Sequence, residues 1–269
     1  MSEGIAWLDG QWGATHELSL PLNDRGLQLA DGLFETVLIQ GGEPQLLEEH
    51  LLRWATSANL LGMASPPERS HLQPLIEEAT MRCGLQRGSG VLRLNWSRGA
   101  SRQRGIDVPQ PAQHRFWMTL ESGEPTFRGV TAIICQQERR NADSLISRCK
   151  TFAYGQAVLA RQEASQQGCN DALLLNTKNQ LCSGTVANLI VKRNGTWLTP
   201  PLSSGCLPGV MRRRALTLGL IKEAELESDL RPDDEAALIN SLSCRPVIAL
   251  NGLPRAQADA EHFWRNLLE

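Results

Sequence analysis

Strand-like and helix-like segments follow one another irregularly along this chain, and this mixture constrains the fold more than any other feature of the sequence. Residues 32–39 combine aromatic and β-branched side chains in one run, which predicts a strand. Residues 47–61 carry leucine and alanine at helical spacing, which predicts a helix that ends at Gly62. Because strands and helices mix without a strict βαβ alternation, we predict an α+β fold. The same patterns predict further helices over 70–83, 151–167 and 209–219, and further strands over 91–96, 115–120, 130–135, 171–175, 186–191, 197–199, 236–239 and 247–250.

A polar segment with structure breakers predicts a division into two domains. Residues 121–128 contain Gly123 and Pro125 among polar side chains, a composition typical of a linker. A chain of 269 residues is long enough to form two cores. We therefore expect a smaller N-terminal α/β domain over 1–120, a linker over 121–128 and a larger C-terminal α/β domain over 129–269.

Charge, apolar content and cysteine usage argue against several classes of protein. The net charge is -2 with scattered cations, so we expect no nucleic-acid partner. No apolar run approaches the ~20 residues that span a bilayer, and the N-terminus lacks the basic and apolar regions of a secretory signal. We therefore expect a cytoplasmic protein without a membrane partner. The seven cysteines are scattered and form no CxxC pair, so neither a disulfide framework nor a metal site is expected.

Lysine is rare in this chain, which makes its positive charge mostly with arginine. Of the 27 lysines and arginines only four are lysines, and Lys150 is the one next to a predicted helix start. A lysine amine can lose its proton and form a Schiff base, which a guanidinium cannot do. The positive partial charge at a helix N-terminus would lower the pKa of the Lys150 amine. The alternative is a solvated lysine at the start of that helix.

His50 and Arg53 lie three residues apart on the predicted helix over 47–61 and share one of its faces. An inward-facing Arg53 would need an anion, and a phosphate group suits its planar fork. The alternative is an arginine on the surface of the helix.

Two further segments offer backbone donors for an anion. Gly209 at a predicted helix start leaves the N–H groups of Val210 and Met211 available. Asn240 and Ser241 follow a predicted strand and offer more N–H groups and a hydroxyl. The alternative is that both segments are ordinary turns.

Arg98 and Arg104 lie in the loop Ser-Arg-Gly-Ala-Ser-Arg-Gln-Arg-Gly. This loop could bind the carboxylates of a substrate, and the alternative is a solvated loop.

Taken together, these segments resemble the class IV aminotransferases, which are the fold type IV pyridoxal-phosphate enzymes. The resemblance covers nearly the whole chain and implies a two-domain architecture like that of D-amino acid aminotransferase. It also implies a Schiff base between Lys150 and pyridoxal 5'-phosphate, and a homodimer that acts on a small-molecule substrate. The motifs follow the family's order: Asp24-Arg25-Gly26, Asp31 to Thr36, Leu47 to Arg53, Lys150, Gly184 to Leu189, Thr199 to Leu202, and Leu207 to Arg212.

The resemblance also implies the residues that bind the cofactor. Its phosphate would be held by Arg53, the backbone at Val210 and Met211, and Ser241. Tyr154, the only tyrosine, would contact the phenolic oxygen of the cofactor, with a packing role as the alternative. The implied set is Lys150, Arg53, Tyr154, Ser183, Leu207, Gly209, Val210, Met211, Asn240 and Ser241.

Within this family, local features resemble the aminodeoxychorismate lyases. Thr36 stands where the lyases keep a hydroxyl thought to assist proton transfer, which implies a catalytic role beside Lys150. Met211 replaces a threonine that is usual in transaminases, and Asn240-Ser241-Leu242 resembles the lyase ending. Arg98 and Arg104 match the lyase loop, although Ile106 replaces an expected tyrosine. We therefore expect a 4-amino-4-deoxychorismate lyase, which forms 4-aminobenzoate and pyruvate in folate biosynthesis.

Ser183 departs from the family pattern, because the family places a glutamate against the pyridine nitrogen at this position. A glutamate keeps that nitrogen protonated, whereas a serine hydroxyl can only hydrogen-bond a neutral nitrogen. Elimination depends less than transamination on a strongly electron-withdrawing ring, so Ser183 favours a lyase. The alternatives are an aminotransferase acting on branched-chain or D-amino acids, and a protein that has lost catalysis and only binds the cofactor or a partner.

Overall fold

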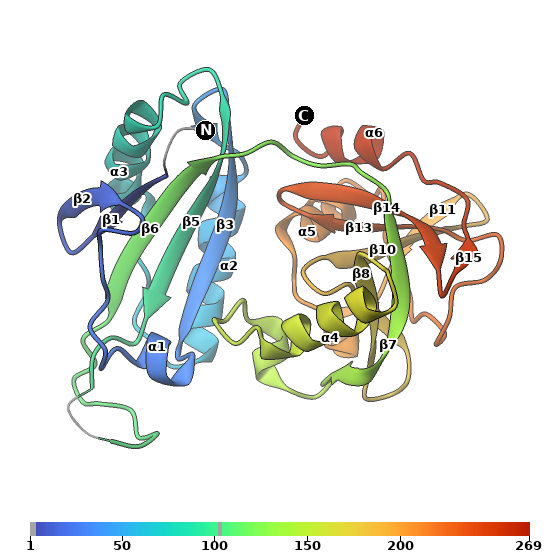
Figure 1. The fold of residues 1–269 in the computed structure, drawn as a ribbon, viewed down its shortest axis with the longest axis horizontal. Helices are drawn as coiled ribbons and strands as arrows, with labels where there is room; N and C mark the ends of the chain where they lie inside the picture. Colours follow the sequence, from blue (N-terminus) through green and yellow to red (C-terminus); the bar gives the residue numbers. More distant parts are fainter. Residues whose placement is uncertain (1–3, 102–103) are drawn as a thin grey trace. The chain divides into compact units, whose positions relative to one another are not determined.

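The chain crosses three times between two separately packed units in this computed structural model, which describes residues 4–101 and 104–269. Unit 1 comprises Met1–Glu124 and Lys150–Ala153, and unit 2 comprises Pro125–Cys149 and Tyr154–Glu269 (Figure 1). The division after Glu124 falls inside the segment 121–128. The return of Lys150–Ala153 to unit 1 is a feature that the sequence did not indicate.

Unit 1 is built on a six-stranded antiparallel sheet in the order β2-β1-β6-β5-β3-β4. β3 (Gly32–Gln40) pairs along its whole length with β5 (Ser89–Ser97), which pairs in turn with β6 (Arg115–Ser122). The helix α2 (Leu47–Leu60) packs on β3, and α3 (Arg69–Arg82) packs on β1. The remaining elements of unit 1 are β1 (Ile5–Leu8), β2 (Gln11–Ala14), β4 (Glu43–Pro44) and α1 (Arg25–Leu29).

The side chains of β3 alternate between the two faces of this sheet, as the pleat requires. Leu33 and Val37 are fully buried in the core beneath the helices, and Glu35 lies on the same face. Phe34 and Thr36 lie on the opposite face. The predicted strand over 32–39 and helix over 47–61 are thus confirmed. One face of β3 points into the core beneath the helices, and the other face carries Thr36.

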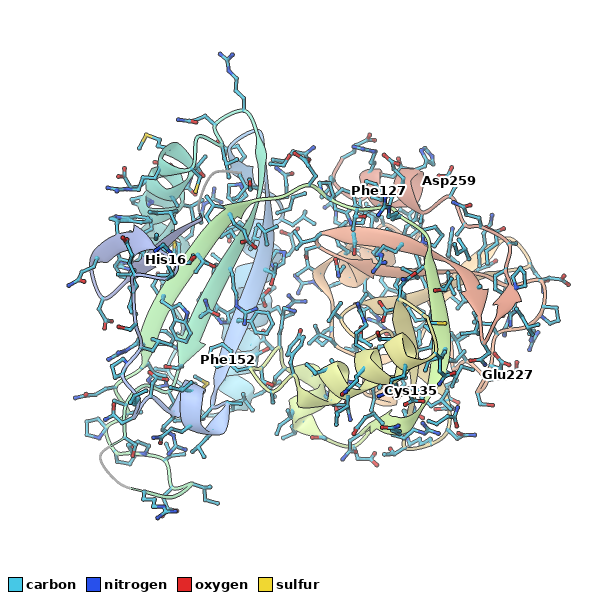
Figure 2. The ribbon with its side chains drawn as sticks, in the orientation of Figure 1. His16, Phe127, Cys135, Phe152, Glu227 and Asp259 are labelled. Atoms are coloured by element: carbon cyan, nitrogen blue, oxygen red, sulfur yellow. The ribbon has the colours of Figure 1, made fainter. Side chains whose placement is uncertain are left out.

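Lys150 lies beside β3 in an extended segment, not at the start of a helix. Thr151 forms an isolated antiparallel bridge with Leu33, and the N–H of Phe34 donates to the carbonyl of Lys150 at 2.9 Å. The N–H of Phe152 (labelled in Figure 2) donates to the carbonyl of Gly32 at 3.1 Å. β4 covers only the far end of this edge of β3, so the segment at Lys150 satisfies backbone groups that would otherwise lack partners.

The helix predicted over 151–167 begins later, at Gly155, because the preceding residues pair with β3. It is α4 (Gly155–Gln166), and Tyr154 is its N-cap residue. The carbonyl of Tyr154 accepts a hydrogen bond from the N–H of Val158 at 2.9 Å, and its side chain is partly exposed. The prediction that Lys150 lies at a helix N-terminus is therefore wrong.

Unit 2 is built on a nine-stranded mixed sheet in the order β12-β11-β10-β13-β14-β7-β8-β9, with β15 beside β14. β9 also pairs with β10 through Ser183 and Asn188, so β10, β13, β14, β7, β8 and β9 form a closed ring. The strands of unit 2 are β7 (Val130–Arg140), β8 (Asp171–Asn176), β9 (Leu181–Ser183), β10 (Asn188–Arg193), β11 (Thr196–Thr199), β12 (Lys222–Glu223), β13 (Glu235–Asn240), β14 (Ser243–Leu250) and β15 (Leu253–Pro254).

Helices and a buried apolar cluster complete unit 2. Leu173, Leu189 and Leu238, on three strands of the ring, are almost fully buried in one apolar cluster. α4 covers β7 and β8, where Cys135 (Figure 2) and Ala164 are fully buried. The other helical segments are the 3-10 turns Leu145–Arg148 and Leu202–Ser204, α5 (Val210–Thr217) and α6 (Ala260–Arg265).

The described part of the chain gives no candidate for a membrane-spanning helix, a metal cluster or a disulfide. Among residues 4–101 and 104–269, no helix combines the length and apolar character needed to cross a membrane. The same residues contain no group of three or more His, Cys, Asp or Glu side chains that could hold a metal ion. All seven cysteines are free thiols, and only Cys169 is more than marginally accessible.

Candidate active site

Lys150 and Thr36, the two residues predicted to be catalytic, lie on the same face of the unit 1 sheet. Lys150 is opposite Phe34 across the antiparallel pairing, and its Nζ is 4.3 Å from the centroid of the Phe34 ring. Thr36 is two residues further along β3 and shares the face of Phe34, about 7 Å along the strand. Lys150 and Thr36 are both partly exposed. The structure therefore brings an amine and a hydroxyl to one side of the sheet.

Arg93 adds a second cation to this face, and sequence reasoning missed it. Arg93 stands opposite Thr36 on β5, and its guanidinium carbon is 3.6 Å from the centroid of the Phe34 ring. Its Nε donates to Oδ1 of Asn95 at 2.8 Å. A cation over an aromatic ring is attracted by the ring quadrupole, so Phe34 orients both Lys150 and Arg93. The sequence feature that could have indicated it is a charged residue inside the predicted strand over 91–96.

Arg53 faces inward, as one of the two readings of its helix predicted, but the anion that it meets is a protein carboxylate. Its Nε donates to Oε1 of Glu35 at 2.8 Å, and its Nη2 donates to Oε2 of the same group. His50 Nδ1 lies 2.6 Å from Oε2 of Glu35. Glu35 and His50 are each 1 % exposed, and Arg53 is 7 % exposed. Sequence reasoning missed Glu35, whose signal was a charged residue inside an apolar strand.

Glu35, His50 and Arg53 form a buried cluster, and the protonation states of its members follow from burial and from the nearby charges. Burial alone would raise the pKa of Glu35, but the Arg53 charge and the hydrogen bonds from His50 and Arg53 outweigh it and hold the pKa at about 2. Burial lowers the pKa of His50, and the positive charges of Arg53 and Lys150 lower it further against the opposing effect of Glu35. Glu35 is therefore ionised and His50 neutral near pH 7. A neutral His50 must carry its proton on Nδ1 to donate to the carboxylate.

Arg98 is used by the protein itself, which is at odds with the expectation that it binds a substrate carboxylate. It is 5 % exposed. Its Nε donates to the carboxylate of Asp31, at 2.9 Å to the nearer oxygen. Its Nη1 and Nη2 donate to the carbonyls of Gly62 and Leu61 at 3.0 and 2.9 Å. Arg104 is exposed in the same loop, and its substrate-binding role stays a prediction.

In unit 2, Ser183 lies at the point where the strand ring closes. It is 7 % exposed and pairs with Leu174 on one side and Asn188 on the other. The side-chain amide of Asn188 donates to the carbonyl of Leu207 at 2.8 Å. A Cβ added to Gly209 would lie 2.0 Å from Oδ1 of Asn188, so only glycine allows this close approach. Asn188 thus ties the strand after Ser183 to the turn before α5.

That turn leads directly into α5, whose first residues were predicted to bind an anion through their backbone. Gly209 is the N-cap residue and supplies no side-chain hydrogen bond to the helix. The side chains of Val210 and Met211 are buried and hold the first turn in place. Amide groups in a first helical turn have no partner within the helix, so this end favours an anion.

Asn240 organises the turn between β13 and β14, which also contains Ser241. Its Oδ1 accepts hydrogen bonds from the N–H of Leu242 at 2.9 Å and the hydroxyl of Ser243 at 3.0 Å. Its side-chain amide donates to the carbonyl of Val186 at 3.3 Å, in the loop after Ser183. Asn240 and Ser241 are partly exposed. Asn240 therefore holds its own turn and the loop after Ser183 together.

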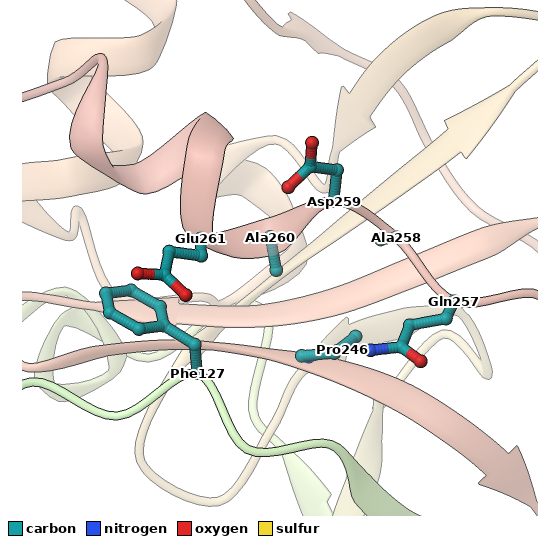
Figure 3. A pocket seen from close by; sticks show the side chains of 7 residues that line it. All are labelled: Phe127, Pro246, Gln257, Ala258, Asp259, Ala260 and Glu261. Atoms are coloured by element: carbon teal, nitrogen blue, oxygen red, sulfur yellow. The ribbon is translucent and has the colours of Figure 1, made fainter.

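A pocket of about 440 Å³ beside α6 contains none of the predicted site residues (Figure 3). Its two carboxylates already have partners, since Asp259 accepts from the N–H of His262 at 3.3 Å and Glu261 pairs with Arg265 at 2.7 Å. Its wall is otherwise formed by Phe127, Pro246, Gln257, Ala258 and Ala260.

Comparison with known proteins agrees first on the fold and then on the family. A solved hypothetical aminotransferase from Mycobacterium tuberculosis, in its PLP-bound form, superimposes with a TM-score of 0.83 at 21% identity, over 98% of this chain and 97% of that chain. The expected α+β, fold type IV architecture is thereby confirmed. The family model for amino-transferase class IV matches residues 32–250, and the chain belongs to this family.

Curated relatives carry two different activities in their names. A probable branched-chain-amino-acid aminotransferase of Aquifex aeolicus (strain VF5) is 33% identical over 242 residues, which are 86% of this chain and 76% of that protein. The aminodeoxychorismate lyase of Vibrio harveyi is 26% identical over 246 residues, which are 88% of this chain and 87% of that protein.

Proposed function

We propose that this chain is a pyridoxal-phosphate enzyme that eliminates pyruvate from 4-amino-4-deoxychorismate and forms 4-aminobenzoate. Membership of the class IV family supports the cofactor. The observation that carries the proposal is the shared face of Lys150 and Thr36 in unit 1, because this reaction needs an amine base and a second proton-carrying group. The reaction belongs to folate biosynthesis, and we expect it to run in the cytoplasm on a homodimer.

The residues present fit the chemistry of this cofactor. In unit 1, Lys150 would hold it covalently, and the buried guanidinium of Arg53 would meet its phosphate group. In unit 2, the first turn of α5 after Gly209 offers backbone donors to the same kind of group. When bound, the cofactor supplies a ring that stabilises negative charge on the carbon next to the substrate amine.

Other residues of unit 2 would complete the binding set. The hydroxyl of Ser183 would hydrogen-bond the pyridine nitrogen, and Tyr154 would contact the phenolic oxygen. Ser241 would donate to the phosphate, while Asn240 and the turn at Leu207 would keep these groups in place. A hydroxyl rather than a carboxylate at position 183 favours elimination over transamination, because a hydroxyl can only hydrogen-bond a neutral pyridine nitrogen.

Proton transfer is assigned to unit 1. The Lys150 amine removes the proton at C4 of the substrate, the bond between C3 and the ether oxygen breaks, and the ring becomes aromatic. The departing enolpyruvyl group gains a proton from Lys150 or from the hydroxyl of Thr36 and becomes pyruvate. Arg104 and Arg93 are the proposed partners of the substrate carboxylates, and Arg93 has the better-defined position because it lies opposite Thr36.

The second candidate is an aminotransferase that acts on branched-chain or D-amino acids. The 33% identity to the Aquifex aeolicus relative favours it. It would use the same Lys150 but would require a 2-oxo acid as acceptor. The two candidates therefore differ in whether pyruvate appears without an acceptor.

The test is to incubate the purified protein and pyridoxal phosphate with 4-amino-4-deoxychorismate and no 2-oxo acid. We expect pyruvate and fluorescent 4-aminobenzoate in equal amounts, and a loss of both in Lys150→Ala, by roughly 10²-fold or more. Amino-group exchange between branched-chain or D-amino acids and 2-oxo acids, with no pyruvate from aminodeoxychorismate, would establish the aminotransferase instead.

A further inference from the structure

The carboxylate of Glu35 is buried where an apolar side chain would be expected. It is 1 % exposed, on the face of β3 that carries the fully buried Leu33 and Val37. Burying a carboxylate is unfavourable unless charged or hydrogen-bonding partners surround it. Here the partners are His50 and Arg53, both from α2. An apolar side chain could fill this space without such partners, so we expect the carboxylate of Glu35 to have a role other than packing.

The hydrogen bonds fix the orientation of the Arg53 guanidinium. Its Nε and Nη2 atoms donate to the two oxygens of Glu35, which sets both the plane and the rotation of the planar group. His50 Nδ1 approaches the same Oε2 atom at 2.6 Å and so holds the carboxylate from a second side. The orientation of the guanidinium is therefore set before any ligand binds.

We propose that Glu35 and His50 are positioning residues that hold the Arg53 guanidinium in the orientation in which it binds the phosphate group of the cofactor. This inference rests on the proposed function, because it takes pyridoxal phosphate as the ligand. Orientation before binding increases affinity, because the side chain does not have to be ordered when the ligand arrives. The effect should be greatest for the phosphate group, since Glu35 bonds Arg53 directly and Arg53 is the proposed phosphate ligand.

A purely structural role of the cluster makes a different prediction. If Glu35 and Arg53 only attached α2 to β3, a change at Glu35 would weaken the binding of any ligand of unit 1 to the same extent. Pyridoxal, which lacks the phosphate group but keeps the aldehyde, separates the two roles. The ratio of the dissociation constants for pyridoxal and pyridoxal phosphate measures the contribution of the phosphate alone.

The experiment determines both dissociation constants by equilibrium dialysis for the full-length wild type, Glu35→Gln, His50→Asn and Arg53→Met. We expect Glu35→Gln to weaken pyridoxal phosphate by roughly tenfold or more and to leave pyridoxal nearly unchanged. His50→Asn keeps a donor close to the position of Nδ1, so it should retain most of the wild-type ratio. Glu163→Gln removes another buried carboxylate, one that accepts from the N–H groups of Gln136 and Gln137, and should leave the ratio unchanged.

A double-mutant comparison tests whether Glu35 affects phosphate binding through Arg53. In Glu35→Gln/Arg53→Met the buried ion pair is removed as a whole, and the ratio should equal that of Arg53→Met. Equal weakening of both ligands by Glu35→Gln, or an unchanged ratio, would overturn the inference while leaving the proposed function intact. A wild type that binds neither ligand would instead overturn the proposed function.

Discussion

At the scale of single residues, the proposed functional groups of unit 1 have surroundings that are set by tertiary contacts. Lys150 and Arg53 stood out because an amine and a planar guanidinium have distinctive chemistry. The partner of Arg53 could not be predicted, since Glu35 is 18 positions away and meets it only when α2 packs on β3. The partners of Arg98 could not be predicted for the same reason, because its bonds to Asp31 and to the end of α2 are tertiary contacts.

The buried Glu35 predicts an acid-sensitive contribution to stability. Its pKa is about 2 in the folded protein against an ordinary value of 4.5, so between these pH values the unfolded chain binds more protons and stability falls as the pH falls. The contribution is fully present above pH 4.5. We expect urea unfolding between pH 7 and pH 2.5 to show that the free energy of unfolding falls less with decreasing pH in Glu35→Gln than in the wild type. Parallel pH profiles for the two proteins would contradict this assignment.

At the scale of elements, local patterns placed most strands and helices within a few residues. The helix predicted over 70–83 is α3 (Arg69–Arg82), and the strand predicted over 91–96 is β5 (Ser89–Ser97). The exception is the segment after Lys150, which pairs with β3 before α4 begins. Pairing between positions 33 and 151 leaves no periodic signal in either segment, so it could not be predicted from local pattern.

Gly32 tests this pairing, because a Cβ at this position would lie 2.1 Å from the ring of Phe152. Gly32→Ala should displace the segment that carries Lys150 and reduce the free energy of unfolding by about 1–3 kcal/mol, with weaker binding of pyridoxal phosphate. Gly155→Ala is the matched control, since no atom lies within 4 Å of its added Cβ and the position is helical. Chemical denaturation and dialysis would measure both effects. A Gly32→Ala protein as stable and as competent in binding as Gly155→Ala would argue against the pairing.

At the scale of the whole molecule, the sequence predicted two domains and a mixed fold but not the path of the chain. The break after Glu124 has a compositional signal, whereas the excursion of Lys150–Ala153 into unit 1 has none. The closure of the unit 2 ring also depends on one pairing, between Ser183 and Asn188, of a strand only three residues long. Such short strands are set by the surrounding packing rather than by their own propensity.

The excursion predicts how the cofactor affects the stability of the whole chain. Lys150 is followed by only three further residues of unit 1 before the chain re-enters unit 2, so a ligand attached there acts on a segment continuous with both units. A ligand that binds only the folded state stabilises it by about 2.7 kcal/mol at a concentration 100 times its dissociation constant. Pyridoxal phosphate at that excess should therefore raise the thermal midpoint of the wild type, as measured by differential scanning calorimetry. Lys150→Ala at the same cofactor concentration should show a much smaller rise, because it lacks the amine proposed to attach the cofactor. An equal rise in the two proteins would place the cofactor's attachment at a residue other than Lys150.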